Sequence, residues 1–197
     1  MAIVLLCSAV TANATSSILL LGDSLSASYG MKQNQGWVYK LNQHLVKTNA
    51  PYKIINASIS GETTAGGLSR LPSIIAKTDF DYLVVELGGN DGLRGFPADV
   101  IKNNLLQIIQ LAKQANKEVF LMQIKIPTNY GPRYNKMFIN VFEQVATETQ
   151  TPLLPFFMEA IVINPNLMQN DGIHPNAKAQ QQIAEIMQKT LEKALTE

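Results

Sequence analysis

The chain of 197 residues contains one cysteine, Cys7, and two histidines. A single thiol cannot close an intramolecular disulfide, and one cysteine with two histidines is a poor ligand set for a structural zinc site. The sequence therefore predicts a domain stabilised by its apolar core, without disulfides and without a metal centre.

An excess of charge of one sign is also missing. Sixteen basic residues against fifteen acidic ones leave a formal charge of +1, and no cluster of Lys or Arg lies along a predicted helix. Because capture of a polyanion needs a basic patch, we expect no nucleic-acid partner. Hydrophobic residues make up 46% of the chain and charged residues 16%, and no linker or repeat interrupts it. This composition predicts one globular domain over residues 15–197.

The chain has little that could cross a bilayer. Residues 2–10 form an apolar run, well below the roughly 20 residues that a spanning helix needs. Ala12, Asn13 and Ala14 follow as a small-x-small pattern of the kind that signal peptidase cuts. We predict that residues 1–14 are a signal peptide cleaved after Ala14, which makes the protein periplasmic or secreted without a stable membrane anchor. No Lys or Arg precedes the run, and a buried first strand is the alternative.

Apolar runs typical of strands alternate along the chain with apolar residues at helical spacing. Short, nearly continuous apolar runs predict strands covered on both faces at 18–21, 52–56, 82–87, 119–124 and 153–157. Apolar residues recur with helical spacing between them, as in 101–112 and 183–194, and Pro175 is expected to begin the last helix. Five β-α units predict an α/β fold, a three-layer α/β/α sandwich around a five-stranded parallel sheet with flavodoxin-like winding.

Reactive residues follow the predicted strands. Ser24 comes after the first, Gly61 after the second, Asn90 after the third and His174 after the fifth. Sites in parallel α/β sheets lie beyond the carboxyl ends of the strands, so we expect these residues at one edge.

Ser24, in the motif Gly-Asp-Ser-Leu at 22–25, is the candidate nucleophile. A serine hydroxyl needs a base to take its proton, and the base needs a partner that fixes its tautomer. His174 and Asp171, in Asp-Gly-Ile-His-Pro at 171–175, can supply both. The alternatives are a capping or turn serine, an Asp171 that caps the last helix beside an exposed His174, and a metal pair. His44 lies on a solvated helix face and is given no role.

Attack on a carbonyl creates an oxyanion, which N–H donors stabilise. Gly61 lets a backbone N–H approach closely, and the Asn90 amide donates without competing for the proton. An ordinary loop glycine and an Asx turn are the alternatives. Asp23 and Asp91 are expected to be loop hydrogen-bonding residues.

Two loops could complete an apolar groove for an acyl chain. Leu93 and Phe96 follow Asn90 among glycines, and Tyr130 lies in a second loop at 127–133. We expect these three residues to contact substrate, with ordinary loop packing as the alternative.

The motifs, taken in order, resemble the signature blocks of the SGNH hydrolase (GDSL lipase/esterase) superfamily. Longer stretches resemble its bacterial periplasmic thioesterase, lysophospholipase and arylesterase members. The resemblance implies that Ser24 is the nucleophile, that His174 is the base, and that Asp171 orients it. It also implies an oxyanion hole formed by the Ser24 N–H, Gly61 and Asn90, with no metal and no organic cofactor.

Two positions depart from the superfamily pattern. Glu62 stands where Asp is frequent, and Ser28 stands where Gly is frequent. Neither matches a catalytic position, although Ser28 could alter the loop behind the nucleophile.

The expected function is hydrolysis of carboxylic esters and thioesters through an acyl-enzyme on Ser24. Activity should fall below about pH 6 to 7, where an imidazole becomes charged. The alternatives are a carbohydrate O-deacetylase of the same superfamily and a non-catalytic flavodoxin-like module that binds a phosphate or flavin at the first loop. The expected partner is a small acyl ester or thioester, and the expected oligomeric state is a monomer.

Overall fold

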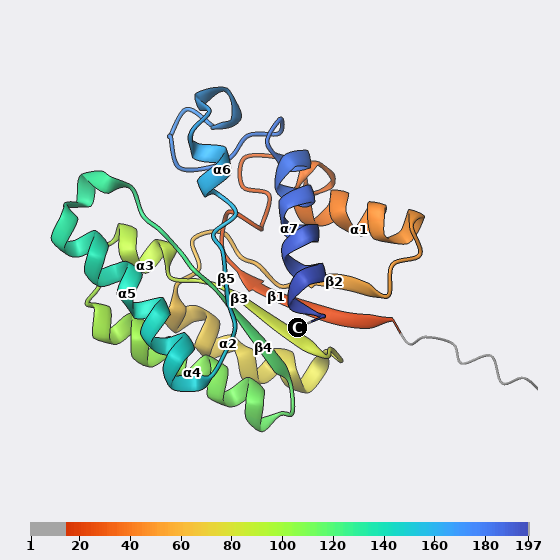
Figure 1. Cartoon of the computed structure of the whole chain (residues 1–197), viewed down its shortest axis with the longest axis horizontal. Coiled ribbons are helices and arrows are strands. Elements are labelled where there is room, and N and C mark those ends of the chain that lie inside the picture. Colours follow the sequence, from red (N-terminus) through yellow and green to blue (C-terminus); the bar gives the residue numbers. More distant parts are fainter. Residues whose placement is uncertain (1–14, 197) are drawn as a thin grey trace, which may run out of the picture.

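A computed structural model describes residues 15–196 of the chain (Figure 1). The predicted signal peptide, residues 1–14, lies outside the described residues, so cleavage after Ala14 stays a prediction. Within residues 15–196, none of the helices combines the length and the apolar character that crossing a bilayer requires.

Five parallel strands form one sheet in the order β2-β1-β3-β4-β5. The strands are β1 (Ser16–Gly22), β2 (Tyr52–Asn56), β3 (Tyr82–Glu86), β4 (Glu118–Met122) and β5 (Leu153–Leu154). This order is that of flavodoxin-like doubly wound sheets. The predicted five-stranded parallel sheet is confirmed.

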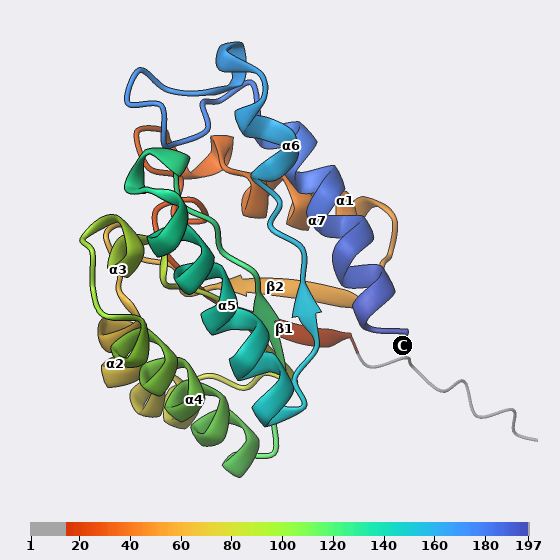
Figure 2. The same cartoon turned by 60° about the vertical axis from the view of Figure 1, so that its left-hand side comes forward.

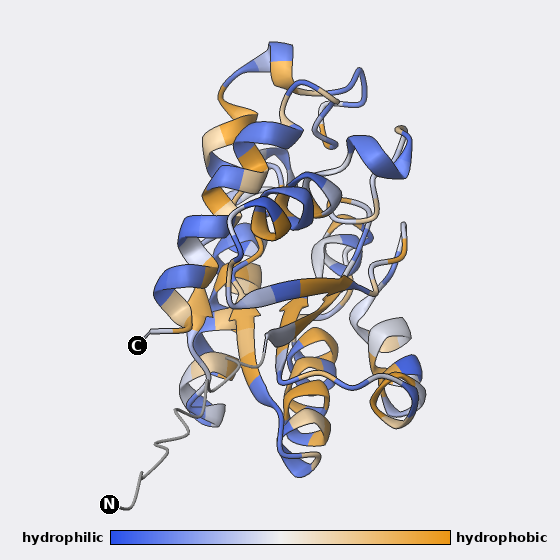
Figure 3. Ribbon diagram, turned by 90° about the vertical axis from the view of Figure 1, so that its right-hand side faces the viewer, coloured by the Kyte–Doolittle hydropathy of each residue, from blue (hydrophilic) through white to orange (hydrophobic). Residues whose placement is uncertain are grey.

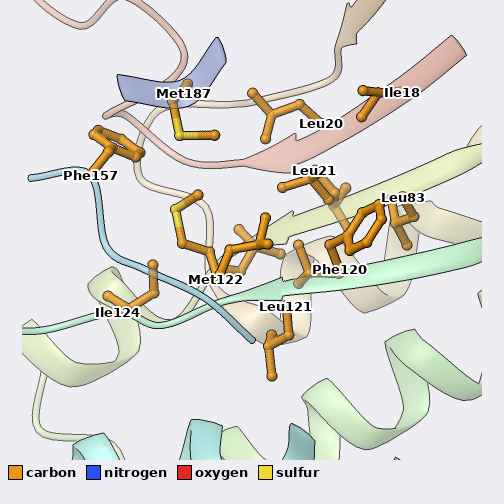
Figure 4. Packing of buried hydrophobic residues seen from close by; sticks show 14 of the residues in the cluster. Ile18, Leu20, Leu21, Leu83, Phe120, Leu121, Met122, Ile124, Phe157 and Met187 are labelled. Carbon is orange, nitrogen blue, oxygen red and sulfur yellow. The ribbon is translucent and has the colours of Figure 1, made fainter. Parts of the chain in front are cut away.

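The strands are apolar because helices cover both faces of the sheet. In β1, Ile18 to Leu21 are at most 2% exposed. Figure 4 shows strand side chains such as Leu20 and Leu121 on opposite sides of the sheet, with Met187 of the last helix near Leu20. Parallel strands buried in this way have no polar face, which explains their uninterrupted apolar runs.

Helices α2 (Thr64–Lys77), α4 (Ala98–Gln114) and α5 (Pro132–Thr149) cover one face, and α1 (Trp37–Lys47) and α7 (Gln180–Ala194) cover the other (Figures 1 and 2). Each longer helix carries both apolar and polar stretches, as the hydropathy colours of Figure 3 show. Their apolar sides face the sheet, which completes the predicted three-layer sandwich. Shorter elements are α3 (Gly89–Leu93), α6 (Glu159–Val162) and the 3₁₀ turns Gln33–Gln35, Thr128–Tyr130 and Pro165–Leu167.

Two predicted boundaries differ from the structure by three residues or more. The fifth strand ends at Leu154 rather than at 157, because Phe157 packs into the core from irregular backbone. Pro175 does not begin the last helix, since α7 begins at Gln180. Pro175 instead pairs with Met168 in an isolated antiparallel bridge, and the Asn176 side chain accepts the Lys178 N–H in a turn that delays the helix.

The direction in which successive strands are added to the sheet reverses at β1. The chain runs from β1 to β2 on one side and from β3 to β5 on the other, so β1 and β3 flank the topological switch point. Loops diverge there and leave a crevice beyond the carboxyl ends of the strands. Ser24 follows β1 and Asn90 follows β3, which places both at this crevice.

Candidate active site

The turn that carries Ser24 is closed by Asp23. The Asp23 carbonyl accepts the N–H groups of Ser26 and Ala27, and its side-chain Oδ1 accepts the N–H of Leu25 at 3.0 Å. Gly22 before it has no room for a side chain, since a Cβ would lie 2.4 Å from Glu86 Oε2. The turn therefore packs tightly on the end of β3 and leaves Ser24 partly exposed.

The loop that carries His174 is held by amide side chains in addition to the bridge between Met168 and Pro175. Gln169 Nε2 donates to the carbonyls of Tyr29 and Pro175, and Asn176 Nδ2 donates to the carbonyls of Asn166 and Met168. These bonds attach a loop near the C-terminus to the turn after Ser24 and fix the position of the imidazole.

Ser24, His174 and Asp171 lie in contact. His174 Nε2 is 2.8 Å from Ser24 Oγ, and His174 Nδ1 is 2.7 Å from Asp171 Oδ2. Asp171 Oδ1 also accepts the N–H groups of Ile173 and His174, each at 2.9 Å. Partial burial would raise the pKa of Asp171, but these bonds and the His174 ring outweigh it and lower the pKa below its ordinary value. Asp171 is therefore a carboxylate that orients the ring, with Nε2 facing the serine.

The three expected oxyanion donors differ in their hydrogen-bond partners. In the described part of the chain, neither the Ser24 N–H nor the Gly61 N–H is engaged by a protein acceptor. Gly61 has a φ of +79°, which a residue with a side chain rarely adopts, and Arg94 Nη2 binds its carbonyl at 3.2 Å. Asn90 Nδ2 donates to Glu62 O at 2.9 Å and to Asp23 Oδ2 at 3.2 Å. Both acceptors require the nitrogen of the amide, so they fix which way Asn90 points.

Sequence reasoning missed Tyr29, which lies in the same turn as the nucleophile. Its ring centroid is 4.2 Å from that of His174, with the planes tilted by 34°. Tyr29 thus packs against the imidazole, and no local pattern indicates a contact with a residue so far along the chain.

A pair of buried carboxyl groups lies beneath the turn. Asp23 is 4% exposed and Glu86 is 0% exposed. Burial raises the pKa of Asp23 to about 6, although the Leu25 N–H opposes the shift. Burial and the nearby Asp23 charge raise the pKa of Glu86 well above its ordinary value. Sequence reasoning gave Glu86 no role, yet a charged residue at the end of an otherwise apolar buried strand was a signal for it.

The carboxyl pair should make stability depend on pH. Because the pKa of Asp23 rises from 3.8 to about 6 on folding, the folded state keeps a proton that the unfolded state loses over this range. Stability contributed in this way is present at low pH and is lost as pH rises, so Asp23 alone should lower the free energy of unfolding by about 1 kcal/mol per unit between pH 4 and 6. Urea titrations at both pH values measure this. Glu86 adds a fall of the same sign, because its pKa is raised as well, so Glu86→Gln should make the slope less steep, and equal slopes in the two proteins would contradict the assignment.

A pocket of about 480 Å³ opens beside Ser24 and His174. Its walls are mainly apolar and come from the segments after β1, β3 and β4, from around α6 and from the His174 loop: Leu25, Leu93, Ile124, Ile126, Pro127, Phe156, Met158, Val162 and Ile173. Lys125 and Glu159 also line it and form an ion pair at 2.8 Å. The pocket suits an apolar group attached to a carbonyl at Ser24.

The three residues expected to contact substrate take different positions. Leu93 lines the pocket. Phe96 does not, because it packs against the core and its carbonyl accepts the Tyr134 hydroxyl. Tyr130 is not among the pocket walls either, and its hydroxyl donates to the Leu93 carbonyl at 2.8 Å. Tyr130 therefore supports Leu93 from outside the pocket.

The remaining candidates are placed as follows. Asp91 is fully buried and accepts the N–H and the hydroxyl of Thr64, which fixes the start of α2 as expected of a structural residue. His44 is exposed on α1. Ser28 adopts a φ of +60°, in the left-handed region that glycine adopts more readily than serine. Among the described residues, no group of three or more His, Cys, Asp or Glu side chains could hold a metal ion.

Comparison with known proteins gives consistent matches. The chain is 48% identical to "Thioesterase 1/protease 1/lysophospholipase L1" of Escherichia coli (strain K12), over 92% of this chain and 86% of that protein. It is 42% identical to an arylesterase of Vibrio mimicus, over 96% of this chain and 94% of that protein. The structure of the psychrotrophic esterase EstA from Pseudoalteromonas sp., inhibited by monoethylphosphonate, matches with a TM-score of 0.91 at 44% identity, over 92% of this chain and 100% of that one.

The model of the GDSL-like lipase/acylhydrolase family matches residues 20–182. This span contains the Gly-Asp-Ser-Leu turn, the Asn90 loop and the His174 loop. The resemblance predicted from the motifs is confirmed, and the chain belongs to the GDSL-like lipase/acylhydrolase family of SGNH hydrolases.

Proposed function

We propose that Ser24, His174 and Asp171 form the catalytic triad of an ester and thioester hydrolase. The observation that carries this proposal is the continuous contact from Asp171 Oδ2 through the His174 ring to Ser24 Oγ, at 2.7 and 2.8 Å. Relatives named as thioesterase, lysophospholipase, arylesterase and esterase support the reaction class. The protein is a serine hydrolase of this type.

The reaction takes two steps. Neutral His174 accepts the Ser24 proton at Nε2 while Oγ attacks the carbonyl carbon, and Asp171 stabilises the imidazolium that results. His174 then gives the proton to the leaving alkoxide or thiolate, which departs as alcohol or thiol and leaves an acyl-enzyme. Water, deprotonated by the same nitrogen, attacks the acyl-enzyme and releases the carboxylic acid.

The oxyanion of each tetrahedral intermediate is stabilised by the N–H groups of Ser24 and Gly61 and by the Asn90 amide. Support for this comes from the two backbone N–H groups that have no protein acceptor among the described residues. The longer Asn90 contact, to Asp23 Oδ2 at 3.2 Å, leaves one N–H that an oxyanion can share.

The acyl group occupies the pocket beside Ser24. Apolar side chains from five segments line it, which favours a hydrocarbon chain over the sugar of a carbohydrate O-deacetylase. A series of p-nitrophenyl esters from acetate to palmitate, with acyl-CoA, lysophospholipid and an acetylated sugar alongside, separates these substrates. Faster turnover of the acetylated sugar than of every acyl ester would favour the deacetylase.

Covalent labelling tests the nucleophile. A fluorophosphonate should react with Ser24, because Oγ attacks phosphorus, fluoride leaves, and the phosphonyl oxygen occupies the oxyanion hole. Peptide mass spectrometry should find one adduct, on the peptide that contains Ser24, and the His174→Ala variant should label far more slowly. No adduct, or an adduct on another residue, would favour the non-catalytic flavodoxin-like module instead.

The location and oligomeric state are also proposals. The apolar run at 2–10 followed by Ala-Asn-Ala supports export to the periplasm with cleavage after Ala14. A monomer is proposed because the nucleophile, base and oxyanion donors all come from one chain.

A further inference from the structure

Glu86 lies directly beneath the nucleophile but has no part in the steps above. It is the last residue of β3 and pairs in register with Gly22, the last residue of β1. Its Oε2 accepts the Ser26 hydroxyl at 2.7 Å and the Asp23 N–H at 3.3 Å. Both donors belong to the turn that presents Ser24, so one side chain binds this turn on either side of the nucleophile.

The surroundings of Glu86 do not suit a charge. The side chain is fully buried, and its Oε1 has no hydrogen-bond partner among the described residues. No ion pair in the described part of the chain involves Glu86 or Asp23. Two adjacent buried carboxyl groups without a cation cannot both be ionised at modest cost, so the pair keeps one proton.

The hydrogen bonds of Asp23 assign that proton to Glu86. Asp23 Oδ1 accepts the Leu25 N–H, and Oδ2 accepts one N–H of Asn90, so both oxygens are used as acceptors. Donors to both oxygens stabilise the charged form of a carboxyl group. Glu86 has both of its donors on Oε2 and none on Oε1, so its charged form would be stabilised at one oxygen only.

We propose that Glu86 is a positioning residue that acts as a neutral acid: it fixes the Ser24 turn through Ser26 and leaves the negative charge on Asp23, which orients the Asn90 amide. This inference rests on the proposed function of Ser24 and Asn90. Glu86 touches neither substrate nor reacting atoms. Its effect reaches the reaction through the backbone of the turn and through Asp23.

A pair of substitutions at position 86 tests the proposal. Glu86→Gln keeps the size and an acceptor oxygen for Ser26 and cannot ionise, so kcat for p-nitrophenyl acetate should stay close to the wild-type value. Glu86→Leu removes the acceptor, and kcat should fall about 10²-fold while KM changes little, because misplacement of reacting groups costs about that much. A Gln variant that loses as much as the Leu variant, or a folded Leu variant with wild-type kcat, would overturn the proposal.

A second variant tests the same contact if Glu86→Leu does not fold. Ser26→Ala removes the hydroxyl bound to Glu86 Oε2 and leaves the carboxyl pair in place. Loss of one hydrogen bond to the turn should lower kcat about tenfold. An unchanged kcat in Ser26→Ala would contradict the role of this contact.

Controls separate this inference from the proposed function. Thr151→Val removes a buried hydroxyl at the opposite end of the sheet, before β5, and should leave kcat unchanged. Ser24→Ala is measured in parallel. Turnover retained in Ser24→Ala would reject the proposed function, whereas an inactive Ser24→Ala beside a fully active Glu86→Leu would reject only the role of Glu86.

Discussion

The Ser24→Ala variant is expected to hydrolyse p-nitrophenyl acetate about 10⁴- to 10⁶-fold more slowly in kcat than the wild-type protein. Removal of Oγ abolishes the acyl-enzyme route, and what is left comes from water held near the oxyanion donors. The contact that disappears is the 2.8 Å approach of His174 Nε2 to Ser24 Oγ. Steady-state kinetics with protein free of contaminating esterase measures the loss.

The fold of this variant should not change. Ser24 is partly exposed, and the turn is held by Asp23 and Glu86 rather than by the Ser24 side chain. Circular dichroism and the melting temperature should match the wild type, and fluorophosphonate labelling should be absent. Turnover within tenfold of the wild type in a cleanly purified sample would show that another residue is the nucleophile.

The Asp171→Asn variant is expected to lower kcat about 10³- to 10⁴-fold. An asparagine keeps the size and an acceptor oxygen for the Ile173 and His174 N–H groups, so the loop should keep its shape. Its Nδ2 would then face His174 Nδ1, which favours the tautomer that carries the proton on Nε2 and cannot accept one from Ser24. Kinetics across pH 6 to 9 measures this effect.

A matched variant separates the effect of the His174 tautomer from the effect of a disturbed loop. Asp171→Ala removes both the partner of the ring and the acceptor for the two backbone N–H groups, so it should also lower the melting temperature. Asp171→Asn should lose activity with little loss of stability. Equal kcat in Asp171→Asn and the wild type would mean that the ring keeps its orientation by other contacts, such as Tyr29.

Much of this architecture could be predicted from the sequence because the apolar patterns that indicate strands and helices are local. The second strand was predicted at its observed bounds, Tyr52–Asn56, since short apolar runs are typical of buried parallel strands. The rule that sites lie beyond the carboxyl ends of such strands then brought Ser24, Asn90 and His174 to one edge.

The features that differ from the sequence-based predictions depend on contacts between distant segments. Pro175 resembled a helix start, but its bridge to Met168 and the Asn176 turn are set by a loop that no local pattern describes. Phe96 was expected near substrate, yet tertiary packing draws it toward the core. Glu86 lies in an apolar run whose pattern predicts a strand, and its closeness to Asp23 depends on the pairing of β1 with β3.

The nucleophile and its base are separated by 150 positions in the chain. A ribosome makes the segment with Ser24 long before the segment with His174, so the growing polypeptide carries a serine that nothing deprotonates. Esterolysis can begin only after synthesis has passed the loop of Gln169 and Asn176 and that loop has docked. On the proposed mechanism, an unfinished chain therefore has no base for Ser24 and cannot hydrolyse esters or thioesters.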